Sequence, residues 1–142
     1  MIAYPVSFYG QSNAQSGMQN KWTVMSSDFS STCAIPKEFE GCGETFSPED
    51  FFLLSLQNCF IATFKVYAEY SKLSFSNLQV SSELIVDKNE IQKPIMKSLK
   101  LNIQLTNTSD IKKADLLIKK TLENGFILQS VKTEIIPMIQ YL

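Results

Sequence analysis

The stretch "SPEDFFLLSLQNCFIATF", from Ser47 to Phe64, carries the strongest secondary-structure signals in the 142-residue chain. Ser47 suits the N-cap of a helix, Pro48 suits its first turn, and the two acidic residues that follow complement the positive end of a helix dipole. Apolar residues then recur at alternating spacings of four and three, which is the period of an α-helix. The sequence therefore predicts a helix from Ser47 to about Ser71, with Cys59 near its middle.

Apolar side chains surround most of this predicted helix. The main stripe and its flanks consist of Phe52, Leu56, Cys59, Thr63, Val66 and Tyr70, and of Leu53, Phe60, Ile61 and Phe64. Because a helix that is apolar on several sides belongs in a protein interior, we expect the central helix of the fold, covered on most sides in its first half. The longest uncharged stretch, Phe51 to Phe64, is shorter than the ~20 residues of a membrane span and contains two amides, so we expect no membrane partner.

The remaining segments predict an α+β fold in a single domain, residues 1–142. Three weak strands are expected upstream, between turns rich in Gly, Asn and Ser, at Tyr4 to Tyr9, Lys21 to Ser26 and Phe29 to Ile35. Downstream, "NLQVSSELIVDK" and "MKSLKLNIQLTN" alternate polar and apolar residues and read as neighbouring antiparallel strands. A last strand is expected in "SVKTEIIPM". The predicted architecture is an antiparallel sheet packed on the buried central helix and on a second helix.

The second helix is predicted in "TSDIKKADLLIKKTLENG", capped by Thr108 or Ser109 and ended by a left-handed Gly125. Its expected inner face consists of Ile111, Ala114, Ile118 and Leu122. Its lysine pairs fit a solvated face, and an anion-binding role is the alternative.

Composition excludes several classes of function. The chain is 44% hydrophobic and 19% charged, and its 13 basic residues are all lysines set against 14 acidic ones. Without arginine or histidine there is no guanidinium clamp and no imidazole base, and nucleic acid is not an expected partner. Neither a zinc-type cysteine spacing nor a phosphate loop occurs, so no metal and no cofactor are expected. The N-terminal residues lack the features of a secretory signal, and three cysteines cannot all pair, so we expect free thiols and a cytoplasmic location.

The stretch "EGCGETFSPEDFFLLSLQNCF" resembles a segment of the OsmC/Ohr family, in which a glycine loop, a Pro-Glu pair and a helix of small residues lead to a reactive cysteine. Pro48, Glu49, Cys59 and Phe60 match that pattern, including the ten-residue step from glutamate to cysteine. The similarity continues through the paired strands into "IKKADLLIKKTLENGFILQSVKTEI". The resemblance implies an OsmC-like fold and an intertwined homodimer. It also implies a stress-response peroxidase that reduces organic hydroperoxides with two cysteines and an external dithiol reductant.

The resemblance also implies roles for particular residues, and this chain departs from two of them. Cys59 matches the attacking thiol, and Glu49 matches the glutamate that holds an arginine beside it. The second, resolving cysteine is replaced in "GFIL" by Gly125 and Phe126, and only a lysine such as Lys21 or Lys65 could replace the arginine. Cys42, in the glycine loop, is a candidate substitute for the resolving thiol.

Structural roles are the alternatives for the same residues. Cys59 and Cys33 also suit packed core positions, and Glu49 also suits a carboxylate at the positive end of a helix dipole. Ten helical residues span about 15 Å, so Glu49 and Cys59 of different copies would have to meet across a dimer interface. Two hypotheses follow: a thiol peroxidase acting on apolar hydroperoxides through Cys59, or a non-catalytic dimer that binds a small apolar ligand. The aromatic residues expected to line an apolar pocket at the dimer seam are Phe52, Phe60 and Phe126.

Overall fold

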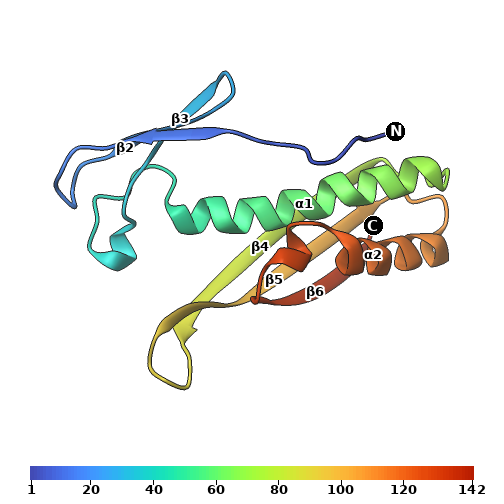
Figure 1. Cartoon of the computed structure of the whole chain (residues 1–142). Helices are drawn as coiled ribbons and strands as arrows, with labels where there is room; N and C mark the ends of the chain where they lie inside the picture. Colours follow the sequence, from blue (N-terminus) through green and yellow to red (C-terminus); the bar gives the residue numbers. More distant parts are fainter. The chain divides into compact units, whose positions relative to one another are not determined.

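The computed structural model describes residues 1–142, which divide into two compact units, Met1–Phe51 and Phe52–Leu142. The long helix α1 (Pro48–Tyr70) begins in the first unit and continues through the second (Figure 1). Its limits agree with the predicted helix. The expectation of a single domain stays a prediction.

The first unit is a three-stranded antiparallel sheet followed by a short 3-10 helix. In chain order its elements are β1 (Gly10–Asn13), β2 (Trp22–Ser26), β3 (Phe29–Cys33) and η1 (Lys37–Phe39). The central strand β2 pairs with both of the others. A tight hairpin joins β2 to β3, and Ser27 adopts a left-handed φ of 54° there.

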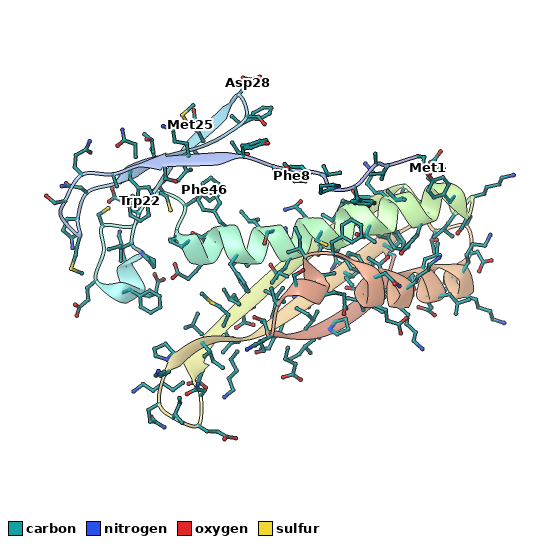
Figure 2. The ribbon with its side chains drawn as sticks, in the orientation of Figure 1. Met1, Phe8, Trp22, Met25, Asp28 and Phe46 are labelled. Atoms are coloured by element: carbon teal, nitrogen blue, oxygen red, sulfur yellow. The ribbon has the colours of Figure 1, made fainter.

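The predicted strand from Tyr4 to Tyr9 is wrong, because the first strand begins at Gly10. Met1–Tyr9 contains Pro5, which has no backbone N–H to donate, and no strand of the chain pairs with it. Its apolar side chains project from an extended ribbon, and Phe8 is 91% exposed (Figure 2). Among the hydrophobic residues of the first unit, only Cys33 and Ala34 are buried. The first unit therefore has no hydrophobic core of its own.

The second unit places helices on a three-stranded sheet. After α1 its elements are β4 (Asn77–Lys88), β5 (Pro94–Thr106), α2 (Ile111–Asn124), the 3-10 helix η2 (Leu128–Ser130) and β6 (Glu134–Tyr141). β4 and β5 pair antiparallel as predicted, but β6 runs parallel to β5, so the sheet is mixed and not purely antiparallel. The cause is the connection through α2, since a helical crossover returns the chain in the same direction.

The core of the second unit lies between one face of this sheet and the two helices. Alternate residues of β5 point into it, and Leu99, Leu101, Ile103 and Leu105 are all fully buried. Helix α1 contributes Leu56, Phe60 and Phe64, and the two phenyl rings stack with centroids 5.9 Å apart. Helix α2 contributes Ala114 and Ile118. The predicted α+β class is confirmed.

The fully buried residues of helix α1 lie on one face, but most residues of its first half, including residues 52–55 and Gln57, are partly buried, so the predicted cover of that half is present in part. Its buried residues are Leu56, Cys59, Phe60, Phe64 and Ala68. By length and composition alone α1 could cross a membrane, and helices that pack in a protein core meet the same criteria; in this chain α1 contributes five residues to the core of the second unit. On the opposite face Asn58, Ala62 and Lys65 are exposed.

Both predicted ends of α2 require correction. The N-cap is Asp110, whose Oδ1 accepts a hydrogen bond from Lys113 N at 3.0 Å, and the Ser109 hydroxyl instead accepts a hydrogen bond from Ser74 N. Gly125 ends the helix with φ −60° and ψ 123°, which is extended and not left-handed. On the inner face Ile111 is exposed, whereas Leu117 and Thr121 are buried.

Candidate functional site

Helix α1 is positioned by a reciprocal cap at its start. The Ser47 hydroxyl accepts a hydrogen bond from Asp50 N at 3.1 Å, and the Asp50 carboxylate accepts one from Ser47 N at 2.8 Å. Each side chain thus satisfies a backbone donor that the helix leaves free. The cap fixes the start of the helix that carries both Glu49 and Cys59.

Cys59 lies near the middle of α1, inside the core of the second unit, with 9% of its surface exposed. The backbone at the end of α2 lies close to its sulfur. A Cβ atom placed on Gly125 would lie 3.1 Å from Cys59 Sγ. In a disulfide, a Cβ lies about 3 Å from the sulfur of the opposite cysteine. The end of α2 therefore lies beside the Cys59 thiol, within the distance that a disulfide requires between a Cβ and the opposite sulfur, but residue 125 supplies no sulfur there.

The backbone conformation at position 125 does not require a glycine. Its φ of −60° suits any L-residue. Space is what restricts the position, because the same Cβ would lie 2.9 Å from Leu128 Cδ1 and 3.2 Å from Thr121 O. A leucine methyl can move, so a small side chain can be accommodated.

Glu49 lies in the first turn of α1, within the first unit. Its Oε2 is buried and has no hydrogen-bond partner. Buried charged groups are normally paired, so this oxygen is an open acceptor for a cation or a donor. The chain has no arginine to fill it, and Lys21, one of the two lysines considered above, pairs with Glu44 at 3.7 Å instead. The other, Lys65, is exposed on α1.

The buried Cys33 thiol belongs to the same unit as Glu49. Burial raises the pKa of Cys33, and the negative charges of Glu49 and Asp50 raise it further against the opposing effect of the Ala34 backbone. A thiol with a raised pKa is a poor nucleophile. Cys33 therefore fits the packed role predicted for it.

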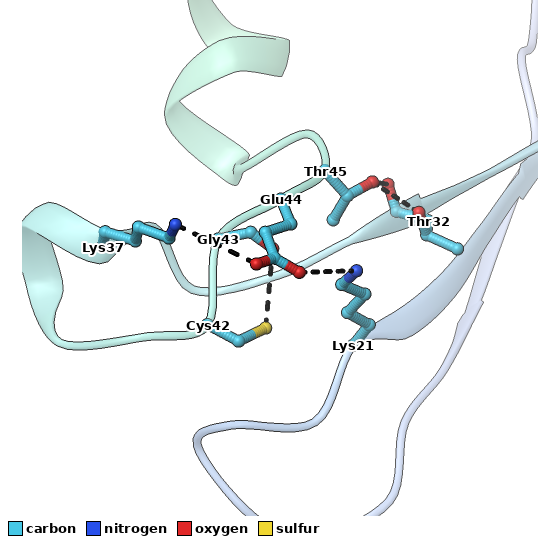
Figure 3. A network of polar contacts seen from close by, with 7 residues as sticks. All are labelled: Lys21, Thr32, Lys37, Cys42, Gly43, Glu44 and Thr45. Atoms are coloured by element: carbon cyan, nitrogen blue, oxygen red, sulfur yellow. Dashed lines mark hydrogen bonds and ion pairs between the residues drawn. The ribbon is translucent and has the colours of Figure 1, made fainter.

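Cys42 sits in an ordered loop between η1 and α1 (Figure 3). Its thiol donates to Gly43 O at 3.5 Å and is half-buried. The neighbouring Glu44 holds a left-handed φ of 64° and pairs with Lys21 and, at 4.0 Å, with Lys37. Cys42 lies in the first unit and Cys59 in the second, so its proposed role as a resolving thiol stays a prediction.

The three aromatic residues expected to line a pocket lie in different environments. Phe60 is fully buried, Phe52 is half-buried against the core, and Phe126 is 76% exposed. The structure shows a different apolar hollow, of about 330 Å³, which sequence reasoning missed. Its lining residues come from β2, β3 and the start of α1: Val24, Met25, Ser26, Phe29, Ser30, Ser31 and Phe51. These residues come from separate segments and follow no common spacing, so no pattern in the sequence predicted the hollow.

Comparison with known proteins places these features in a family. The family described as OsmC-like protein matches residues 41–138, which include the Cys42 loop, Glu49, Cys59 and Gly125. The chain belongs to the OsmC-like protein family. The uncharacterized protein YmaD of Bacillus subtilis is 32% identical over 80 residues. That match covers 56% of this chain and only 53%, about half, of the length of YmaD.

Solved structures show the same OsmC-like fold over nearly the whole chain. An OsmC-like protein of unknown function from Vibrio cholerae has a TM-score of 0.82 at 17% identity, covering 95% of this chain and 99% of that one. An organic hydroperoxide resistance protein, OsmC, from Legionella pneumophila has a TM-score of 0.71 at 16% identity, covering 98% of each chain. The organic hydroperoxide resistance protein OhrB of Bacillus subtilis has a TM-score of 0.67 at 15% identity, covering 95% and 98%. Identities this low show the fold alone, and the predicted OsmC-like fold is confirmed.

Proposed function

We propose that this OsmC-like protein reduces organic hydroperoxides with Cys59 as the only sulfur of the site and with an external dithiol as reductant. The single observation that carries the proposal is the 3.1 Å approach of a residue-125 Cβ position to Cys59 Sγ. This short distance supports a site whose backbone could hold two cysteine sulfurs, at positions 59 and 125, but which contains only the sulfur of Cys59. Proteins of the same fold include two named for organic hydroperoxide resistance.

The chemistry balances with one protein thiol. The Cys59 thiolate attacks an oxygen of the hydroperoxide ROOH, the O–O bond breaks, and ROH leaves while Cys59 becomes a sulfenic acid. One thiol of the external reductant then displaces water and forms a mixed disulfide with Cys59. The second thiol of the reductant releases Cys59 as a thiol and leaves an oxidised dithiol. The net reaction converts ROOH and a dithiol into ROH, water and a disulfide.

The thiolate requires a nearby positive charge, because burial raises a thiol pKa and a helix dipole acts only near the helix end. In this chain only a lysine can supply that charge. Glu49 would hold it, and its open Oε2 supports that role. Since Glu49 and Cys59 are about 15 Å apart along α1, the proposed site combines residues of two copies.

A homodimer is therefore part of the proposal, and the apolar surface of the first unit supports it. The first unit buries only two hydrophobic residues, Cys33 and Ala34, and needs a cover that its own strands do not provide. The free state of all three cysteines fits a cytoplasmic location.

A non-catalytic dimer that binds a small apolar ligand is the second candidate function. The low exposure of Cys59, 9%, and the absence of any arginine favour it. Under this alternative Cys59 is a packed core residue, and a hydrophobic molecule occupies the site.

Intact-mass measurement after one equivalent of cumene hydroperoxide separates the two functions. If the protein is a peroxidase, the parent chain and Cys42→Ser should gain the mass of one oxygen, whereas Cys59→Ser should not. A reagent specific for sulfenic acids should label the same two proteins. Consumption of the peroxide should follow the same pattern. An unchanged mass and undiminished peroxide would eliminate the peroxidase, and a co-purifying apolar molecule would then favour the binding protein.

A further inference from the structure

A methyl group of Leu128 lies beside the Cys59 thiol in the second unit. A Cβ atom on Gly125 would lie 2.9 Å from Leu128 Cδ1 and 3.1 Å from Cys59 Sγ. The methyl and the sulfur are therefore no more than 6.0 Å apart, the sum of these two distances. No water molecule fits directly between two such groups at that separation. Leu128 thus covers the sulfur on this side, and it is itself only 4% exposed.

The glycine at position 125 leaves the space for this methyl. Carbon atoms that are not bonded pack about 3.5–4.0 Å apart. A side chain at position 125 would begin 2.9 Å from Leu128 Cδ1 and would push that methyl out of its present place. The backbone there has a φ of −60°, which does not require a glycine. The missing side chain therefore matters through the volume that it leaves to Leu128.

Leu128 is also the part of this core that can move most easily. Nearly all buried core residues of the second unit belong to α1, α2, β4 or β5, whose regular hydrogen bonds hold them in place. Only Leu73 and Leu128 lie outside these elements. Leu128 belongs to η2, a 3-10 helix of three residues, and 3-10 hydrogen bonds have poorer geometry than those of an α-helix. Leu128 can therefore withdraw without breaking a helix or a strand.

Residues 126–130, which we call the flap, carry Leu128 and have few attachments. Leu128 is buried, and the other four residues of the flap are exposed. Two hydrogen bonds donated by Ser130 stay within the flap. Gln129 donates two to the end of α2, one to Gly125 O at 2.9 Å and one to Leu122 O at 2.8 Å. Segments with so few buried contacts open at a lower free energy than the core does.

The reduction step of the proposed reaction requires such an opening. An external thiolate must bring its sulfur to about 2.05 Å from Cys59 Sγ, the length of an S–S bond. In this step the S–O bond of the sulfenic acid breaks, the S–S bond forms, and the oxygen leaves with a proton as water. The incoming sulfur also brings its own carbon chain. With Cys59 only 9% exposed, a group of that size needs part of the cover to move.

We propose that Leu128 is the gate to Cys59 and that the flap opens to admit the thiol of the external reductant. The thiol enters through the volume beside Gly125 that the leucine methyl fills when the gate is closed. The inference rests on the proposed function for what passes the gate, whereas the gate itself follows from the packing of Leu128.

Thiol labelling tests the gate without peroxide. Leu128→Ala removes the gate, and Leu73→Ala is the matched control, since Leu73 is 6% exposed in the same core but follows the C-terminal end of α1. Each protein is treated with N-phenylmaleimide, and peptide masses give the labelling rates of Cys59 and of the buried reference Cys33. Relative to the parent, Cys59 should react at least about tenfold faster in Leu128→Ala and within about threefold in Leu73→Ala. The rate at Cys33 should be the same in all three proteins.

Two results would overturn the gate. Equal acceleration at Cys59 in both variants would show that general loosening of the core exposes the thiol. No acceleration in Leu128→Ala would show that Leu128 does not limit access. If Leu128→Ala fails to fold, the parent chain decides. Labelling through the flap should change little with low concentrations of urea, because little surface opens, whereas a rate that rises as steeply as global unfolding would overturn the gate.

Reduction by dithiothreitol separates the gate from the proposed function. After oxidation of Cys59 with one equivalent of cumene hydroperoxide, dithiothreitol should restore the thiol at least about tenfold faster in Leu128→Ala than in Leu73→Ala. Equal rates of reduction would overturn the role of Leu128 in this step, even where labelling supports the gate. If Cys59 gains no oxygen while labelling still distinguishes the two variants, the proposed function is overturned and the gate is not.

Discussion

The two units of the chain differ most in what they bury. The second unit encloses a continuous core between one sheet face and two helices. The first unit has exposed hydrophobic side chains such as Phe8 and Phe29 and buries only Cys33 and Ala34 among its hydrophobic residues. A domain of about 50 residues is marginal even with a full core. The comparison shows that a single sheet layer, however apolar, does not make a core until another layer covers it.

Matched Phe→Ala variants should give the largest difference between the units. Phe60→Ala removes a fully buried ring, and we expect it to lower the free energy of unfolding by about 3–5 kcal/mol. Phe29 is 80% exposed within the chain, so in dilute protein Phe29→Ala should cost less than about 1 kcal/mol. Urea unfolding at several protein concentrations measures both. A growing loss for Phe29→Ala as the protein is concentrated would show that a second copy covers the first unit, and equal losses at every concentration would break the comparison.

Gly125→Cys should strengthen the second unit alone. The new thiol would lie where a disulfide with Cys59 can form, and closing a loop of that length stabilises by up to about 4 kcal/mol. Under oxidising conditions we expect the loss of two free thiols and a higher melting temperature. Amide exchange should slow in α2 and β5 but not in β1–β3. Gly125→Ser is the matched control without a sulfur, and the appearance of only mixed disulfides in Gly125→Cys would contradict the geometry.

Gly41→Ala tests the first unit, where tight backbone contacts replace a core. A Cβ at Gly41 would lie 2.0 Å from Ile35 O, and a backbone carbonyl cannot move aside as a side chain can. We expect a loss of about 1–3 kcal/mol, as for other forced overpacking. At Gly10 the nearest atom would be 3.6 Å away, so Gly10→Ala is the control and should change stability little. Thermal unfolding followed by Trp22 fluorescence reports on this unit, and equal midpoints for the two variants would refute the steric argument.

The sequence predicted most accurately the elements in which the spacing of apolar residues matches the face that is buried. The alternation in β5 placed Leu99 and Ile103 on the core face, where both are fully buried, and the cap at Ser47 located the start of α1. Predictions failed where a choice depended on tertiary neighbours. Asp110 caps α2, while the Ser109 hydroxyl accepts a hydrogen bond from the distant Ser74 N, and β6 is parallel to β5 because the chain crosses over through α2.

The candidate site was predictable only as a set of residue types. The sequence showed that no cysteine follows Cys59, but the proximity of Gly125 to its sulfur depends on how α2 packs against α1. The open Oε2 of Glu49 likewise depends on burial, which no spacing reveals. The sequence shows that α1 has more apolar residues than one buried face requires, but it does not show what covers the exposed face of this helix.

Alkaline pH should have the smallest effect on the free energy of unfolding. It should destabilise the first unit at a lower pH than the second. Burial raises the pKa of Cys33 from 9.0 in the first unit, and burial together with the hydrogen bond to Asp115 raises the pKa of Tyr141 from 10.0 in the second. Both groups are neutral when protonated, so an unfolded chain releases these protons at lower pH than a folded one. Each contribution to stability is complete below the unfolded pKa and declines as the pH rises towards the folded pKa. Stability should therefore begin to fall above about pH 9 and fall further above about pH 10.

Cys33→Ala should remove the first decline and Tyr141→Phe the second in urea titrations at fixed pH. Identical alkaline profiles for both variants and the parent would show that neither group is held neutral by the fold.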